Sequence, residues 1–376
     1  MPKSFRVLLA PDSFKGSLSA IQFCEIATQV IHSIQPDALV VSRPMSDGGE
    51  GFVDSFVFAG LAEQQTLWTS NALGRKTKAT FAWQADSKTA IIEMAQASGL
   101  PQIRQEERNP LQTHTYGTGQ IIQAALELGA KKIILGLGGS ATNDGGAAAL
   151  QALGIPLLNS KGKSVGLGGQ VLAQIKEIGD IPAHLLQIEW QLACDVTNPL
   201  LGEHGATRIF GPQKGVTERN FDTLEKGLAN WATLIENKTG KQVKDIPGAG
   251  AAGGMAAGFI GLLNAQVTPG FDILNERLKL ETLIAEKEFD YILTGEGRMD
   301  EQTRFGKLPM RIAELGLKYG MPTIGICGSL TCSPDDLPEF KALFSIMNHP
   351  MSEMEALQNT PVLLKDTLTS VINLIV

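Results

Sequence analysis

LGLGGSATNDGG, residues 135–146, continues the apolar run KKIIL and leads into the alanine-rich segment AAALQALG. A strand, a glycine-rich loop and a helix in this order are typical of an α/β fold, in which ligands bind beyond the carboxyl ends of parallel strands. The glycines would let a ligand approach the backbone, and a helix beginning near Asn143 would direct N–H groups at an anion. The stretch matches neither GxGxxG nor a Walker loop. It predicts either a phosphate-binding loop or a turn that packs a helix against a strand.

Both ends of the chain share an alternation of strands and helices. The first sixty residues predict strand, helix, strand and helix, and FDYILTGEG, PTIGICGSL and ALFSI predict further parallel strands. Residues 62–96 alternate apolar and polar side chains, which predicts antiparallel strands. We therefore predict an α/β protein with a discontinuous, Rossmann-like doubly wound domain, residues 1–65 and 266–376. A second, unlike α/β domain, residues 66–265, is inserted into it, and the active-site cleft is expected between the two.

The composition favours small molecules as partners. The 376 residues carry a formal net charge of -7, which argues against a nucleic-acid surface and against a polybasic membrane contact. Residues 248–271 lack charge, but they are rich in glycine and alanine and predict a packed helix rather than a membrane span. We expect no signal peptide, no membrane partner and a cytoplasmic location.

Seven short segments rich in glycine lie at the end of an apparent strand, and six of them also contain Asp, Glu, Lys or Ser. They are APDSFKGS, PMSDGGEG, GLGGSATNDGG, ACDVTNPLLGEHGA, FGPQKG, PGAGAAGG and TGEGRMDEQTRFGK. Because ligands of open α/β sheets bind where such loops gather, the segments predict one cleft for an anionic small molecule. The five histidines show no metal-binding spacing, so histidine chemistry is not expected.

Charged residues in the first two segments have two interpretations each. Lys15 could neutralise a phosphate or a carboxylate, or it could be an ordinary exposed lysine. Ser13 beside it could equally cap a helix. Asp47 and Glu50, three residues apart at a strand-helix junction, suit Mg²⁺, and Asp47 could accept a hydroxyl proton. An acidic first helical turn explains the same two residues without a ligand.

The last segment, after a strong strand, is the richest in charge. Glu296, Arg298, Asp300 and Lys307 combine carboxylates and cations in a glycine-containing loop, as phosphoryl transfer needs. Asp195 directly follows the apolar run WQLAC, where a carboxylate must be partnered or exposed in a cleft. From the residues alone, the chain is predicted to be a two-domain α/β enzyme acting on anionic small molecules, and a kinase is the favoured class.

These segments resemble the bacterial type-one glycerate kinase family. The matching stretches are APDSFKGSLSA, SDGGEG, ASGL, RNPLQTHTYGTG, GGSATNDGGAAALQALG, ACDVTNPLLG, FGPQKG, PGAGAAGGMAAG and TGEGRMDEQTRFGK, in family order. The resemblance implies ATP-dependent phosphorylation of D-glycerate, usually to 2-phosphoglycerate, with Mg²⁺. Phe52, His114, Met310 and Arg311 depart from the family pattern, but none of them replaces a charged candidate.

The resemblance also implies roles for the candidate residues. Catalysis is assigned to Asp195 as the first choice of base, with Asp47 next, and to Lys15. Phosphate or substrate binding is assigned to Ser13, Lys15, Gly138, Gly139, Ser140, Asn143, Asp144, Arg298 and Lys307. The metal ligands are expected among Asp47, Glu50, Glu296 and Asp300.

Several alternatives stay open at this point. The kinase could form 3-phosphoglycerate or act on another small hydroxy acid. A dinucleotide-dependent oxidoreductase would also have glycine-rich loops after strands, although GxGxxG is missing after the first strand. A non-catalytic sensor of organic acids is a third possibility. The sequence is compatible with a monomer or a homodimer.

Overall fold

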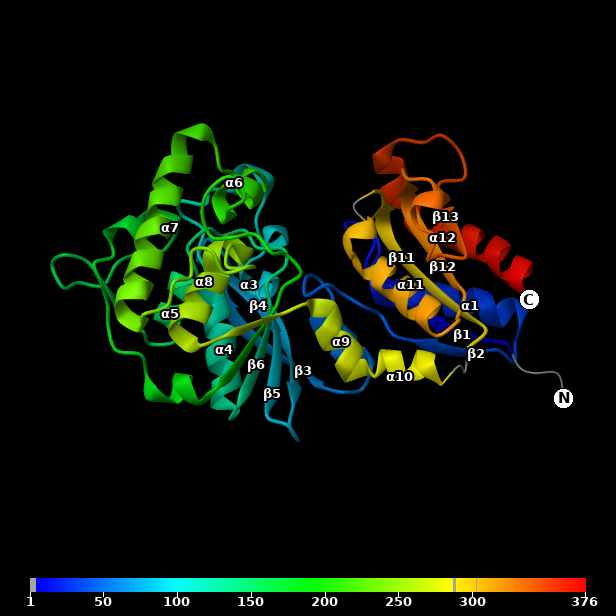
Figure 1. Ribbon diagram of the computed structural model, residues 1–376, viewed down its shortest axis with the longest axis horizontal. Coiled ribbons are helices and arrows are strands. Elements are labelled where there is room, and N and C mark those ends of the chain that lie inside the picture. Colours follow the sequence, from blue (N-terminus) through cyan, green and yellow to red (C-terminus); the bar gives the residue numbers. More distant parts are fainter. Residues whose placement is uncertain (1–4, 287–288, 302) are drawn as a thin grey trace. The chain divides into compact units, whose positions relative to one another are not determined.

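The computed structural model describes residues 5–286, 289–301 and 303–376. The chain forms two compact units, and Figure 1 shows their elements. Unit 1 consists of Met1–Asp47, Asp54–Gly60 and Phe271–Val376, and unit 2 consists of Gly48–Val53 and Leu61–Gly270. Each unit is built around its own β-sheet.

Unit 1 contains a five-stranded sheet in which every neighbouring pair is parallel. Its order is β13-β12-β11-β1-β2. The strands are β1 (Arg6–Leu9), β2 (Leu39–Ser42), β11 (Tyr291–Met299), β12 (Thr323–Leu330) and β13 (Ala342–Ser345). From β1 the chain continues to β2 on one side, whereas from β11 it continues to β12 on the other side. The carboxyl ends of β1 and β11 are therefore the topological switch point, where such sheets bind ligands.

Helices cover both faces of this sheet. Phe23 in α1 (Ala20–Ile34) and Leu364 in α12 (Glu353–Ile375) share one apolar core with Leu293 of β11. The adjacent residue, Ile292, faces the other way, toward Gly316 of α11 (Leu308–Lys318). The unit is thus doubly wound. Its remaining helices are α2 (Phe52–Phe58), α9 (Gly270–Leu278) and α10 (Leu280–Ala285), the first two of which begin in unit 2.

Unit 2 contains a six-stranded mixed sheet with the order β10-β9-β6-β5-β4-β3. The strands are β3 (Glu63–Ser70), β4 (Lys76–Gln84), β5 (Thr89–Glu93), β6 (Lys132–Gly136), β9 (Glu189–Ala193) and β10 (Gln266–Thr268). The pairs among β10, β9, β6 and β5 are parallel. The pairs β3–β4 and β4–β5 are antiparallel, which confirms the prediction for residues 62–96.

The helices of unit 2 pack around a large apolar core that includes Trp231 and Phe259. The longer helices are α4 (Tyr116–Glu127), α7 (Glu218–Thr239) and α8 (Ala251–Leu263). The shorter ones are α3 (Ala95–Ser98), α5 (Ala147–Ala152) and α6 (Ala206–Phe210), and a small antiparallel pair is formed by β7 (Leu157–Leu158) and β8 (Glu177–Ile178). Among the described residues, no helix has both the length and the apolar character needed to cross a bilayer.

The predicted fold class is confirmed. A discontinuous, Rossmann-like doubly wound part is formed from both ends of the chain, and an unlike α/β part comes from the middle. One local prediction was wrong, because α5 begins at Ala147 and not near Asn143. Gly145 and Gly146 take φ angles of 61° and 74°, in the left-handed region, so the chain turns there before the helix begins.

Candidate active site

Carboxyl groups gather at the switch point of unit 1. Asp12 follows β1, and its N–H donates to the Gly295 carbonyl oxygen in β11 over 2.8 Å. One carboxylate oxygen of Asp12 accepts the Ser13 N–H at 2.6 Å. Burial and the charges of Asp47 and Glu296 raise the pKa of Asp12 well above its ordinary value, although the Ser13 hydrogen bond lowers it. Acidic groups from the ends of three strands therefore interact at this edge.

Glu296, in β11, belongs to a network of charged groups. Its Oε1 accepts the Thr303 hydroxyl at 3.1 Å, and its Oε2 lies 3.6 Å from Lys307 Nζ. Lys307 also donates to Asp300 Oδ1 over 3.2 Å, and Arg298 Nε lies 3.2 Å from Asp300 Oδ2. Burial raises the pKa of Glu296 to about 7, even though Lys307 lowers it. A carboxyl group with this pKa changes charge near neutral pH, as groups that exchange protons or bind cations in active sites commonly do.

The other candidates of unit 1 lie at the same edge. Lys15 is exposed and Ser13 is half-buried in the loop between β1 and α1, and Asp47 is exposed after β2. A Cβ atom on Gly297 would lie 3.4 Å from the Lys15 backbone nitrogen, so this loop runs close over β11. Helix capping does not explain Ser13, because the residue that caps α1 is Ser19.

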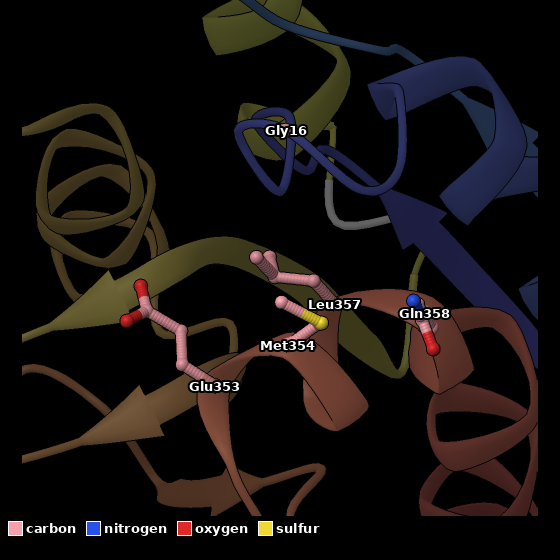
Figure 2. Close-up of a pocket in the computed structure, with 5 residues that line it drawn as sticks. All are labelled: Gly16, Glu353, Met354, Leu357 and Gln358. Carbon is pink, nitrogen blue, oxygen red and sulfur yellow. The ribbon is translucent and has the colours of Figure 1, made fainter.

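A shallow pocket opens beside the loop between β1 and α1. Its volume is about 370 Å³, and it is lined by Gly16 and by four residues of α12. Figure 2 shows Met354 and Leu357 between this helix and the loop with Gly16, and Glu353 and Gln358 to either side. The pocket is open to solvent, and its lining is mostly apolar, with Glu353 and Gln358 as the polar side chains.

In unit 2, the loop that leads into α2 lies against the carboxyl ends of β5 and β6. Gly138 N–H donates to the Gly48 carbonyl oxygen over 3.2 Å. Val53 N–H donates to the carboxylate of the buried Glu93, the last residue of β5, over 2.7 Å. Glu50 is exposed in the same loop. Residues 48–53 are therefore fixed to the carboxyl ends of these strands and to the glycine-rich loop that follows β6.

Asp144 holds the glycine-rich loop from one side. It is fully buried, and its Oδ2 accepts the N–H and the hydroxyl of Thr115, each at 2.8 Å. Its Oδ1 accepts the Gly146 N–H at 3.2 Å. Asn143 is also fully buried, and its amide nitrogen donates to Thr207 Oγ1 over 3.3 Å. The two side chains thus stabilise the shape of the loop.

Lys214 holds the loop from the other side. This residue ends the single turn Pro212–Lys214 and is 1% exposed. Its Nζ donates to Ser140 Oγ over 2.7 Å and to the Thr142 carbonyl oxygen over 2.8 Å. Burial lowers the pKa of Lys214 to about 7, and the Asp144 carboxylate opposes this shift. A buried ammonium group therefore fixes the backbone and the serine of the loop.

The loop also contacts a strained turn at the start of α8. Ala252, Gly253 and Gly254 have φ angles of 54°, 65° and 84°, all in the left-handed region. A Cβ atom on Gly253 would lie 2.1 Å from the Thr142 carbonyl oxygen, and Gly145 N–H donates to the Gly253 carbonyl oxygen over 3.0 Å. Glycine is required at Gly253 by this close approach, whereas Ala252 adopts a conformation that costs an L-residue about 1 kcal/mol or more.

Asp195 lies at the same edge of the unit 2 sheet, directly after Cys194 and the end of β9. It is exposed, and its Oδ2 accepts the Gly270 N–H at 3.2 Å. On the glycine-rich loop, Gly139 is exposed and Gly138 is half-buried, whereas Ser140 is 7% exposed. The candidates of unit 2 therefore include exposed groups and buried groups that shape the loop.

The structure brings the predicted residues together in two groups. Those of unit 1 are Ser13, Lys15, Asp47, Glu296, Arg298, Asp300 and Lys307, and those of unit 2 are Glu50, Gly138, Gly139, Ser140, Asn143, Asp144 and Asp195. Asp12, Glu93 and Lys214 were not among the predicted site residues. Lys214 is the charged residue of FGPQKG, but a lysine in a loop with glycine and proline predicts exposure, and its burial depends on tertiary packing.

In both units, charged and polar groups lie at the carboxyl ends of parallel strands. This arrangement is typical of α/β enzymes that act on anionic small molecules. Comparison with known proteins narrows the class. Residues 7–376 match the glycerate kinase family, and the chain belongs to this family.

Individual relatives cover most of the chain. Glycerate kinase from Halalkalibacterium halodurans is 42% identical over 97% of this chain and 97% of its own length. Glycerate 2-kinase from Escherichia coli is 44% identical over 87% of this chain and 86% of its own. A crystal structure assigned to glycerate kinase 2 of Salmonella typhimurium has a TM-score of 0.84 and 38% identity, and it covers 98% of each chain.

Proposed function

We propose that this protein transfers the γ-phosphoryl group of ATP to the 2-hydroxyl of D-glycerate, giving 2-phosphoglycerate. The observation that supports the reaction most strongly is membership of the glycerate kinase family over residues 7–376. The choice of hydroxyl is supported by the 44% identity to a relative named glycerate 2-kinase.

Residues of unit 1 suit the binding of phosphate and of a cation. Lys15 and Lys307, with Arg298, are cations that could neutralise phosphate or the glycerate carboxylate. Phosphoryl transfer needs little covalent chemistry from the protein, and positioning and charge neutralisation supply most of the catalysis. We infer that the charged groups in and after β1 and β11 position the phosphate and neutralise its charge.

The carboxylates of unit 1 fit a shared Mg²⁺ site. Among the residues that the structure describes, no three Asp, Glu, His or Cys side chains are grouped tightly enough to hold a metal alone. Kinase sites typically bind Mg²⁺ through one or two carboxylates together with substrate phosphates. Asp47 and Glu296 both repel the carboxylate of Asp12, and a bound cation would relieve this repulsion. We propose Asp47 and Glu296 as ligands, together with Asp12, and keep Glu50 and Asp300 as further candidates. Bound Mg²⁺ would supply neutralisation of phosphate charge.

Asp195 is proposed as the base that accepts the hydroxyl proton, and Asp47 is the second choice. Asp195 is exposed and follows a strand end, so its carboxylate can reach a substrate. The domain boundaries at 65/66 and 265/266, and a cleft between the two domains, stay predictions.

The proposal is tested by measuring ADP release from ATP and Mg²⁺ with and without D-glycerate, and by coupling the product to enolase. D-Glycerate should stimulate ADP release, and enolase should consume the product directly. A product that reacts only after phosphoglycerate mutase is added would contradict the 2-phospho assignment. Absence of stimulation by D-glycerate would contradict the proposed substrate.

A further inference from the structure

Lys214 is a charged side chain enclosed by unit 2, and it has no role in the function proposed above. Its residue is 1% exposed, and its two hydrogen bonds both go to the glycine-rich loop, at Ser140 and at Thr142. Removing an ammonium group from water costs several kcal/mol, and a methionine of similar length would avoid that cost. Stability alone therefore does not account for a lysine at this position.

The bond from Lys214 determines what Ser140 can do. A hydroxyl has one hydrogen and two lone pairs. Because Lys214 Nζ donates to Ser140 Oγ over 2.7 Å, one lone pair is occupied and the hydroxyl hydrogen must point away from the ammonium group. Within the described parts of the chain, Ser140 Oγ has no acceptor for this hydrogen, and the residue is 7% exposed at the carboxyl edge of the sheet.

Nearby contacts keep the loop in this arrangement. Lys214 Nζ also holds the Thr142 carbonyl oxygen, and the Ser140 backbone forms an isolated bridge with Gly99. Leu100 N–H donates to the Gly139 carbonyl oxygen over 2.8 Å. These backbone contacts fix the position of Ser140. The bond from Lys214 Nζ then determines where the hydroxyl hydrogen of Ser140 points.

We propose that Lys214 is a positioning residue, which fixes Ser140 so that the serine hydroxyl donates its hydrogen to an oxygen of a bound anion. The inference rests on the proposed kinase function. The anion is the glycerate carboxylate or a phosphate of ATP, which share the same acceptor chemistry. The hydrogen bond that Ser140 Oγ accepts from Lys214 polarises the hydroxyl and strengthens the bond that the hydroxyl donates.

The test is a double-mutant cycle with Ser140→Ala, Lys214→Met and the double variant, with KM measured separately for D-glycerate and for ATP. A hydrogen bond to a charged group corresponds to a loss of about tenfold to a hundredfold in kcat/KM. Both single variants should raise KM for the same substrate, and that substrate identifies the anion. The double variant should lose little more than the worse single variant, because both remove one interaction.

Lys241→Met is the matched control. Lys241 is another lysine of unit 2 that donates to a backbone carbonyl, that of Ile260, over 3.2 Å. Its replacement should change stability but not kcat/KM. If Lys214→Met does not fold, Lys214→Gln takes its place in the cycle, because its shorter side chain lacks the ammonium group, and it should raise KM for the same substrate as Ser140→Ala.

Two results would overturn the inference while the wild-type protein phosphorylates glycerate. One is a double variant whose loss equals the product of the two single losses, which would mean that the residues act independently. The other is Ser140→Ala with unchanged kcat/KM for both substrates, a result that does not depend on any Lys214 variant. Failure of the wild-type protein to use glycerate would count against the proposed function instead.

Discussion

Replacing Lys214 by methionine should change how the free energy of unfolding of unit 2 depends on pH. In the unfolded chain this lysine has its ordinary pKa of 10.5, whereas burial lowers its pKa to about 7 in the folded protein. Between these two values the unfolded chain binds one proton more than the folded protein. The folding free energy of the wild-type protein therefore becomes more favourable as pH rises through this window, and the methionine variant lacks this gain.

The size of this pH dependence follows from the difference between the pKa of Lys214 in the unfolded chain and in the folded protein. One pH unit in the window is worth about 1.4 kcal/mol, so between pH 7.5 and 9.5 the wild-type protein should gain about 2 to 3 kcal/mol relative to Lys214→Met. Urea unfolding followed by tryptophan fluorescence measures this difference. All four tryptophans, Trp68, Trp83, Trp190 and Trp231, lie in unit 2, so the signal reports the unit that contains Lys214.

The comparison has a control on the surface of the same unit. Lys163 is exposed, and Lys163→Met should show the same pH dependence as the wild-type protein. A stability difference between wild type and Lys214→Met that stays constant from pH 7.5 to 9.5 would refute the reasoning. It would mean that the Lys214 side chain keeps its ordinary pKa and is not enclosed as the structure shows.

Three further predictions concern the site and the strained turn. Because the pKa of Glu296 is raised to about 7, activity that needs its ionised carboxylate should increase as pH rises through about 7. Glu296→Gln should abolish this increase when kcat/KM is measured as a function of pH. Asp195→Asn and Asp47→Asn should each lower kcat by more than about tenfold with unchanged circular dichroism, and normal turnover in either would remove that residue from the mechanism. Ala252→Gly should raise the free energy of unfolding by up to about 1 kcal/mol, because glycine accepts the left-handed φ; a lower value from urea unfolding would show that the turn is unstrained.

The sequence predicted the fold class well because its signals are local. Apolar runs such as those of β1 and β11 are typical of strands buried in a parallel sheet, and the alternating pattern of residues 62–96 predicted the antiparallel strands. The start of α5 was predicted too early, near Asn143. Its actual position depends on Gly145 and Gly146, whose left-handed turn is held by the hydrogen bond from Gly145 N–H to the Gly253 carbonyl oxygen, a contact between residues far apart in the chain.

For the candidate site, the sequence indicated which residue types to consider but not whether their side chains are exposed or buried. Exposed groups such as Lys15 and Asp47 are recognisable because charged residues in glycine-rich loops after strands indicate ligand binding. The sequence could not distinguish them from Lys214, which has the same kind of sequence context but is fully enclosed. Asp12 was not among the predicted site residues, because its interaction with Glu296 arises from the pairing of β1 with β11, two strands far apart in the chain.

The central claim is phosphorylation of glycerate at its 2-hydroxyl, and a ³¹P NMR spectrum of the product tests it most directly. After incubation with ATP, Mg²⁺ and D-glycerate, the account predicts a new phosphomonoester signal split into a doublet, because the phosphorus then couples to the single hydrogen on carbon 2. A triplet would place the phosphate on the CH₂ carbon and contradict the proposed product. A spectrum without a new phosphomonoester signal would contradict the proposed reaction itself.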